Sequence, residues 1–163
     1  MSAAHSGHDR PVPIARCATL ARPQTPRLPV PSVSLSKSLA VLIVDDNRDA
    51  ADSLAIFLEF RGCKVRVVYD GPAAVQAALS DPPDCAVLDI GMPGLDGFSV
   101  ARRLKSDPAT AGVRLVALSG YVDGETGVDS ATAGFDRYLV KGRVDADQVL
   151  GTLTELTAAG SDG

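Results

Sequence analysis

The chain has 163 residues, of which 45% are hydrophobic and 22% are charged, enough for one folded domain with a hydrophobic core and a short additional segment. Residues 1–38 have a net charge of +4, from five basic residues and one acidic residue, and because the whole chain has −4, residues 39–163 carry −8. An acidic folded part argues against nucleic acid as a direct partner and favours a divalent cation or a basic protein surface.

No run approaches the roughly 18 apolar residues of a membrane span, and the N-terminus lacks the apolar stretch of a signal peptide. The three cysteines, Cys17, Cys63 and Cys85, are odd in number and lack metal-ligand spacing. Cys85 lies in an apolar run and is expected to be a small buried side chain. We therefore expect a cytoplasmic protein with reduced thiols and no membrane partner.

Residues 1–38 are predicted to be a disordered, proline-rich basic tail. They contain six prolines and few large apolar side chains, so neither a long helix nor a core can form. His5 and His8 are interpreted as solvated side chains. Two alternatives remain open for this segment: contact with an anionic partner, and a translation start further along the chain.

From residue 39 onward, short apolar runs alternate with helical patterns. Gly62 is expected to end the first helix and Pro72 to begin the second. The helix over 122–133 is expected to be short or frayed, because glycine and β-branched residues weaken it. The predicted strands are 39–46, 64–70, 84–89, 113–120 and 135–140, and the predicted helices lie within 47–62, 72–80, 97–106, 122–133 and 145–158.

Strands that alternate with helices predict an α/β domain with a parallel sheet. Ligands in such domains bind where the carboxyl ends of the strands meet. Polar residues stand at four of these ends: Asp45 and Asp46 after the first strand, Asp89 at the third, Ser119 at the fourth and Lys141 after the fifth. The sequence therefore predicts that these five side chains share one edge of the sheet.

The residue types in this set are suited to phosphoryl transfer. Three neighbouring carboxylates repel each other, and Mg²⁺, which prefers oxygen ligands, relieves the repulsion. An aspartate can attack phosphorus to form an acyl phosphate, while an ammonium group and a hydroxyl stabilise the phosphoryl oxygens. Taken singly, each residue has an ordinary explanation: a helix cap for Asp46, Asn47 or Asp96, a loop start for Ser119 and Gly120, a surface lysine for Lys141, and packing for Tyr138.

Four segments in this order and spacing, VLIVDDN, LDIGMPGLDG, ALSGY and GFDRYLVK, resemble the receiver domain of two-component response regulators. The resemblance implies a flavodoxin-like, doubly wound, five-stranded parallel sheet of order 2-1-3-4-5 with five helices. It places the receiver domain at residues 39–159 and leaves 160–163 as a short C-terminal tail, with no room for an output domain.

The resemblance also implies a role for each site residue. Asp89 would be the phosphoacceptor, taking its phosphoryl group from a sensor histidine kinase or a histidine phosphotransfer protein. The predicted face of helix 122–133, the fifth strand and the fifth helix would then signal to an unknown downstream protein. The remaining roles are Mg²⁺ binding by Asp45, Asp46, Asp89 and the backbone carbonyl of Gly91, and phosphate binding or switching by Ser119, Gly120, Lys141 and Tyr138.

One position departs from the family pattern, which usually has Lys-Pro with a cis peptide where this chain has Lys141-Gly142. A cis bond without proline costs about 2.5–4 kcal/mol. We therefore expect a trans peptide, a looser loop and a less well aimed lysine.

A self-phosphorylating, otherwise non-enzymatic switch is the expected function, and several other functions compete with it. A phosphorelay intermediate and a phosphate sink use the same site, and a phosphate-free interaction module would only keep the fold. A Mg²⁺-dependent phosphatase of the haloacid dehalogenase type needs a second acid two residues after the first-strand aspartate, where this chain has Asn47. A nucleotide-binding domain is disfavoured because neither GxxxxGK[ST] nor GxGxxG occurs.

Overall fold

The computed structural model describes residues 38–120 and 134–160. The predicted helix 122–133 and all of the predicted tail except residue 38 lie outside these ranges, and so does most of the short C-terminal tail. Strands and helices in the described part follow one another in the order β1 (Ala40–Val44), α1 (Arg48–Phe60), β2 (Lys64–Val68), α2 (Gly71–Ser80), β3 (Cys85–Asp89), α3 (Gly97–Ser106), β4 (Arg114–Ser119), β5 (Arg137–Val140) and α4 (Ala146–Ala159).

The strands form one parallel sheet of order β2-β1-β3-β4-β5, which confirms the predicted topology. Val44 at the end of β1 pairs with Leu88 of β3, Asp89 pairs with Leu118 of β4, and Ser119 pairs with Val140 of β5. This register aligns the carboxyl ends of β1, β3, β4 and β5 at one edge of the sheet.

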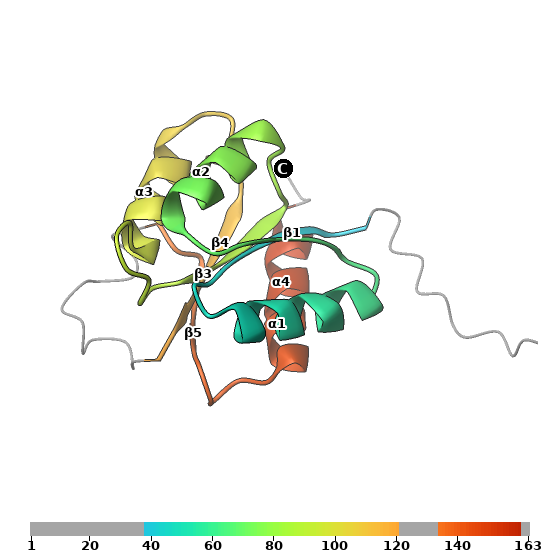
Figure 1. Cartoon of the computed structure of the whole chain (residues 1–163). Helices are drawn as coiled ribbons and strands as arrows, with labels where there is room; N and C mark the ends of the chain where they lie inside the picture. The colour runs from blue at the N-terminus through green and yellow to red at the C-terminus, as the bar shows by residue number, and fades with distance from the viewer. Residues whose placement is uncertain (1–37, 121–133, 161–163) are drawn as a thin grey trace, which may run out of the picture. The chain divides into compact units, whose positions relative to one another are not determined.

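Two helical layers cover the sheet, with α1 and α4 on one face and α2 and α3 on the other (Figure 1). Alternate side chains of β1 serve the two layers: Val41 and Ile43 pack in the core beneath α1 and α4, and Leu42 and Val44 pack beneath α2 and α3. Burial on both faces explains why β1 and β3 are continuous apolar runs rather than alternating ones.

Side-chain caps begin the helices close to the strand ends. The Asn47 side chain accepts a hydrogen bond from the backbone N of Ala50, and Asp96 accepts one from Ser99 at the start of α3. Asp145 and Gln148 form a capping box at α4. The caps hold three helix N-termini at the sheet edge that carries Asp45 and Asp89.

Both cysteines in the described part are buried and unpaired by disulfides. Burial, followed by the nearby charges of Asp84 and Asp136, raises the pKa of the Cys85 thiol to about 12. Cys85 is therefore a packing residue, as its apolar surroundings in the sequence predict.

Asp136 joins the start of β5 to β4. Its carboxylate accepts a hydrogen bond from the backbone N of Leu115 at 2.8 Å and lies 3.2 Å from an Arg114 nitrogen and 3.5 Å from Lys105 Nζ. The contacts of Asp136 fix the position of β5, whose far end leads to Lys141.

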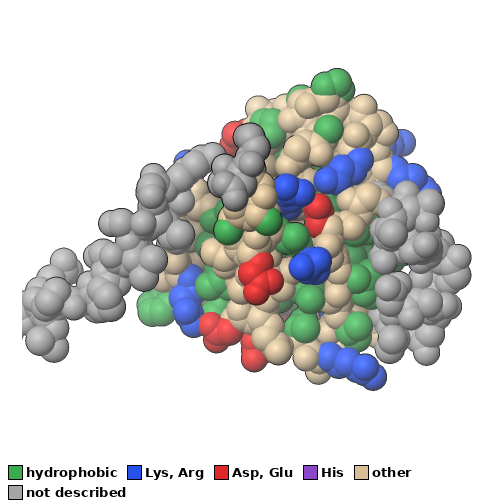
Figure 2. All heavy atoms as spheres, turned by 180° about the vertical axis from the view of Figure 1, so that it is seen from behind, with side chains coloured by type: hydrophobic (Ala, Val, Ile, Leu, Met, Phe, Trp, Pro, Cys, Tyr) green, Lys and Arg blue, Asp and Glu red, His purple; other side chains and the backbone are tan. Residues whose placement is uncertain are grey.

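On the side of the domain seen in Figure 2, basic and acidic side chains are interspersed among hydrophobic ones.

None of the described helices combines the length and the apolar character that crossing a bilayer requires; the longest, α4, has 14 residues.

Candidate functional site

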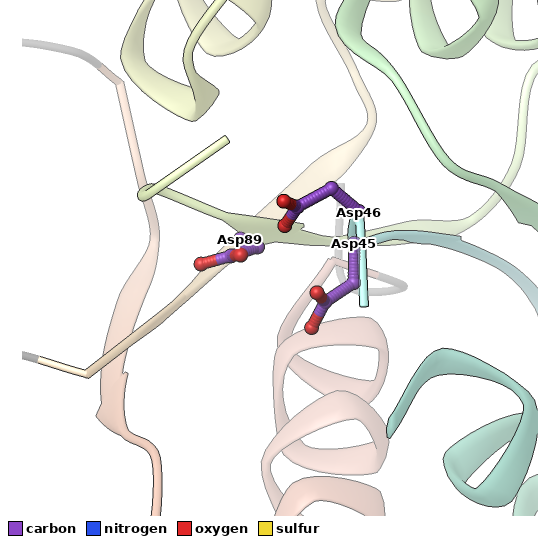
Figure 3. A group of neighbouring side chains, drawn as sticks. All are labelled: Asp45, Asp46 and Asp89. Atoms are coloured by element: carbon purple, nitrogen blue, oxygen red, sulfur yellow. The ribbon is translucent and has the colours of Figure 1, made fainter. Parts of the chain in front are cut away.

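Three carboxylates meet where β1 and β3 end. Asp45 and Asp46 follow β1, Asp89 is the last residue of β3, and one oxygen from each lies within 4.8 Å of the others (Figure 3). Asp45 and Asp89 are buried, with 3% and 6% of their surfaces exposed, whereas Asp46 is exposed. The structure thus brings together the three acidic side chains that the sequence pattern placed at one edge.

Lys141 connects the two buried carboxylates. Its Nζ lies 2.7 Å from an Asp45 oxygen and 3.2 Å from an Asp89 oxygen. Its backbone N donates a 2.6 Å hydrogen bond to the carbonyl of Ser119 at the end of β4. The ammonium group is therefore held beside Asp89 by contacts at both ends of the residue.

Backbone N–H groups fix the remaining oxygens of the buried carboxylates. The N–H of Asn47 donates to Oδ1 of Asp45 at 2.9 Å, and the N–H of Gly91 donates to Oδ1 of Asp89 at 3.1 Å. In each buried carboxylate, one oxygen thus accepts a backbone hydrogen bond and the other forms an ion pair with Lys141. The arrangement is preorganised, because no donor has to move to orient Asp89.

Burial governs the ionisation of Asp89. Loss of solvation raises its pKa above the ordinary value of 3.8, and the Gly91 N–H and the Lys141 charge offset only part of that rise. For Lys141, burial works to lower the pKa, but the hydrogen bond to Asp45 and the negative charges of Asp89 and Asp45 outweigh it and leave the pKa raised. The folded protein therefore opposes ionisation of Asp89 and keeps Lys141 charged.

Replacing Asp89 with asparagine should stabilise the metal-free protein at neutral pH, because the amide has nearly the same shape and no buried charge, and Lys141 keeps Asp45 as its partner at 2.7 Å. The folded-state pKa of Asp89 lies above its unfolded value, so the ionised group opposes folding once the pH exceeds the folded pKa. The stability difference between variant and wild type should therefore shrink as the pH falls toward 3.8. Urea unfolding with a chelator, from neutral to acid pH, measures it; a variant less stable at neutral pH contradicts the account.

The donor set fits a hard divalent cation. All three side chains offer carboxylate oxygens, which Mg²⁺ prefers, and the exposed Asp46 leaves one side of the group open to water, which Mg²⁺ usually retains as part of its coordination shell.

The other predicted site residues lie on β4, the neighbour of β3, directly after β4, and on β5, one strand further from Asp89. Ser119 is the buried last residue of β4, and the exposed Gly120 follows it. Tyr138 on β5 pairs in register with Ala117, two residues before Ser119. Its ring is half-buried against a small cluster made by Ile90, Phe98, Ala117 and Phe135.

One site contact was not anticipated from the sequence. A Cβ on Gly97 would lie 2.5 Å from the backbone oxygen of Asp89 and 3.0 Å from Cα of Ile90. The first turn of α3 therefore packs directly on the main chain of Asp89. The only signal in the sequence was the pair Asp96-Gly97, for which only a turn and a helix cap were predicted; the cap is confirmed.

The expectation of a trans peptide between Lys141 and Gly142 is confirmed, because no peptide bond in the described part of the chain is cis. The ammonium group of Lys141 reaches both Asp45 and Asp89. The loop is a hydrogen-bonded turn in which Gly142 has φ +78°. That this lysine is less well aimed than in a Lys-Pro loop stays a prediction.

The chain matches the family model for the response regulator receiver domain over residues 41–153. It is 36% identical over 129 residues to a gliding motility regulatory protein of Myxococcus xanthus, covering 79% of this chain and 17% of that protein. It is 39% identical over 101 residues to the response regulator PleD of Caulobacter vibrioides, covering 60% and 22%. The chain thus spans about a fifth of the length of these two relatives.

Solved structures share the fold. A CheY-like receiver domain protein from Methanospirillum hungatei aligns with a TM-score of 0.71 and 25% identity over 77% of this chain and 98% of that one. The receiver domain of a Pseudomonas aeruginosa sensor histidine kinase, solved with a magnesium ion in its active-site cleft, aligns with a TM-score of 0.69 and 24% identity over 75% and 99%. The sheet order, the alignment of these folds and the match over residues 41–153 agree: the chain belongs to the response regulator receiver domain family.

Proposed function

We propose that this receiver domain accepts a phosphoryl group on Asp89 from the phosphohistidine of a sensor histidine kinase or a histidine phosphotransfer protein. The observation that carries the proposal is the placement of Asp89, a buried carboxylate at a strand end with an ammonium group 3.2 Å away and two more carboxylates within 4.8 Å. Membership of the receiver family supports the same assignment.

The residues that would hold Mg²⁺ are Asp45, Asp46, Asp89 and the backbone carbonyl of Gly91. When bound, the ion would neutralise the clustered carboxylates and attract the oxygens of the incoming phosphoryl group. Magnesium in the cleft of the P. aeruginosa receiver domain agrees with this assignment.

In the transfer step, the protein's own part falls to residues at and just after the strand ends. A carboxylate oxygen of Asp89 forms a bond to phosphorus as the bond between phosphorus and the donor histidine nitrogen breaks, and that nitrogen keeps the electron pair. Lys141, held by Asp45 at 2.7 Å, lies where it can neutralise charge on the phosphoryl oxygens. The backbone N–H of Gly91 holds Oδ1 of Asp89 in a fixed direction.

The new phosphate would act as a switch through Ser119 and Tyr138. A dianion on Asp89 attracts the Ser119 hydroxyl, with Gly120 leaving the approach open, and Tyr138 then turns into the vacated space. Half-burial of Tyr138 and its pairing with Ala117, two residues before Ser119, support this coupling. Phosphorylation would bias an existing equilibrium of the face that includes β5 and α4, which then binds a downstream protein.

The protein would act in the cytoplasm and have no catalytic activity beyond its own phosphorylation and dephosphorylation. Whether it ends a pathway, passes the phosphoryl group on or serves as a sink depends on its partners. A phosphatase would instead turn over a phosphorylated substrate many times per molecule.

Incubation with acetyl phosphate and Mg²⁺, followed by intact mass, tests the proposal. We expect a single phosphoryl adduct on the wild type that is absent with a chelator and absent in Asp89→Asn. An adduct that persists in Asp89→Asn assigns the nucleophile to another residue. The lack of any adduct from both acetyl phosphate and a histidine kinase would overturn the proposal.

A further inference from the structure

The segment from Val140 to Arg143 forms a tight turn directly after β5. The backbone N of Arg143 donates a 3.1 Å hydrogen bond to the carbonyl of Val140, and Gly142, the third residue of the turn, has φ +78°. A hydrogen-bonded turn with positive φ at its third residue has the type II pattern, which strongly favours glycine there.

Lys141 is the second residue of this turn. Its backbone N–H donates a 2.6 Å hydrogen bond to the carbonyl of Ser119 on β4. Lys141 also forms an isolated β-bridge with Val144, the first residue after the turn. With the backbone fixed on both sides, the side chain leaves the turn toward Asp45 and Asp89.

We propose that Gly142 is the positioning residue for Lys141: its left-handed backbone conformation sets the direction in which the ammonium group points. This inference rests on the proposed function, because the aim of Lys141 matters only if a phosphoryl group arrives at Asp89.

The effect of a side chain at this position would be purely conformational. A Cβ built on Gly142 meets no atom within 4 Å, so no clash complicates the substitution. An ordinary L-residue avoids φ near +78° and would turn the Lys141–Gly142 peptide plane away to relieve the strain. Asparagine tolerates this region better than alanine does. Alanine should therefore misdirect Lys141, and asparagine should restore much of its aim.

The chain supplies a matched control in Gly62, which follows the C-cap of α1. Gly62 has φ +92°, and a Cβ there also meets no atom within 4 Å. The two ends of α1 differ in their relation to the site. Asn47, which caps the N-terminus of α1, is hydrogen-bonded to Asp45, whereas Gly62 lies after the C-terminus. Gly62→Ala and Gly142→Ala thus introduce the same kind of backbone strain, and only the second does so next to Lys141.

The experiment compares the wild-type chain, Gly62→Ala, Gly142→Ala and Gly142→Asn. Three quantities are measured: the phosphorylation rate constant with acetyl phosphate at saturating Mg²⁺, the affinity for beryllium trifluoride by ¹⁹F NMR, and unfolding by urea. Beryllium trifluoride is a phosphoryl mimic that undergoes no transfer, so its binding reports the aim of Lys141 independently of turnover. Circular dichroism establishes that each variant folds.

We expect Gly142→Ala to lower both the rate constant and the mimic affinity by about tenfold, as a misplaced charged group does. Gly142→Asn should recover most of this loss, and Gly62→Ala should stay close to wild type in both quantities while losing stability. If Gly142→Ala matches Gly62→Ala in rate and mimic binding, the inference is wrong and the proposed function stands. If the wild type and Gly62→Ala take up no phosphoryl group, the proposed function fails and the inference fails with it.

Discussion

Replacing Lys141 with alanine should slow phosphorylation of Asp89 by about a hundredfold or more, the usual effect of removing one preorganised charge-stabilising group. The cause is the loss of the ammonium group 3.2 Å from Asp89, beside the position where phosphoryl charge develops. Rate constants from intact mass, with acetyl phosphate as donor, measure the effect.

The same substitution should lower the stability of the metal-free protein. Asp45 and Asp89 would face each other without the cation between them. Removing one partner of a fully buried ion pair costs about 3–5 kcal/mol; the loss here should be smaller, because 31% of the Lys141 side chain is exposed. Mg²⁺ should restore part of the lost stability by taking over the neutralisation.

Lys64→Ala is the control for both effects, because Lys64 is an exposed lysine at the start of β2. It should leave the rate and the stability close to wild type. A Lys141→Ala protein that is phosphorylated at nearly the wild-type rate would contradict the role given to this lysine.

Replacing Gly97 with alanine should destabilise the domain by about 1–3 kcal/mol, the usual cost of overpacking. The new methyl group would lie 2.5 Å from the backbone oxygen of Asp89, and backbone cannot turn aside as a flexible side chain can. Phosphorylation should slow as well, because relief of the clash displaces Asp89 from Gly91 N–H and Lys141.

Gly151→Ala is the matched control for Gly97→Ala. Gly151 is an exposed residue within α4, and a Cβ there meets nothing within 4 Å. Alanine has the higher helix propensity, so this variant should gain roughly 0.5–1 kcal/mol and be phosphorylated normally. Urea unfolding and phosphorylation rates of both variants provide the comparison. Equal stability of the two would show that α3 does not pack on Asp89 as described.

The sequence predicted the parts of the fold that hydrophobic pattern governs. Continuous apolar runs marked β1 and β3 because both are buried on two faces. The buried side chains of α4, Val149, Leu153 and Leu156, recur at helical spacing, so the sequence pattern already shows an apolar face there. The main errors were at element ends: the run ending at Asp46 extended the first strand two residues beyond Val44.

The site was predictable only as a set of residue types at strand ends. A parallel sheet brings the ends of β1, β3, β4 and β5 together, so Asp45, Asp46, Asp89 and Lys141 meet whatever the details of packing. That one lysine would touch both buried carboxylates depends on side-chain geometry, which sequence pattern does not contain.

Two glycines carry information that sequence pattern could not reveal. Gly97 follows a helix cap in the sequence, and only the structure shows its Cα against the backbone of Asp89. Gly142 looked like a loss of rigidity relative to Lys-Pro, yet its positive φ belongs to a hydrogen-bonded turn. In both cases the decisive quantity is the local path of the backbone.

The chemical location of the phosphoryl group tests the central claim most directly. Sodium borohydride reduces an acyl phosphate to an alcohol, so a phosphorylated aspartate becomes homoserine, which peptide mass spectrometry locates. After phosphorylation with Mg²⁺, we predict homoserine at position 89 alone, and none when Mg²⁺ is chelated before the donor is added. Homoserine at Asp45 or Asp46, or a phosphate that resists borohydride and maps to serine or histidine, would contradict the assignment of Asp89 as the phosphoacceptor.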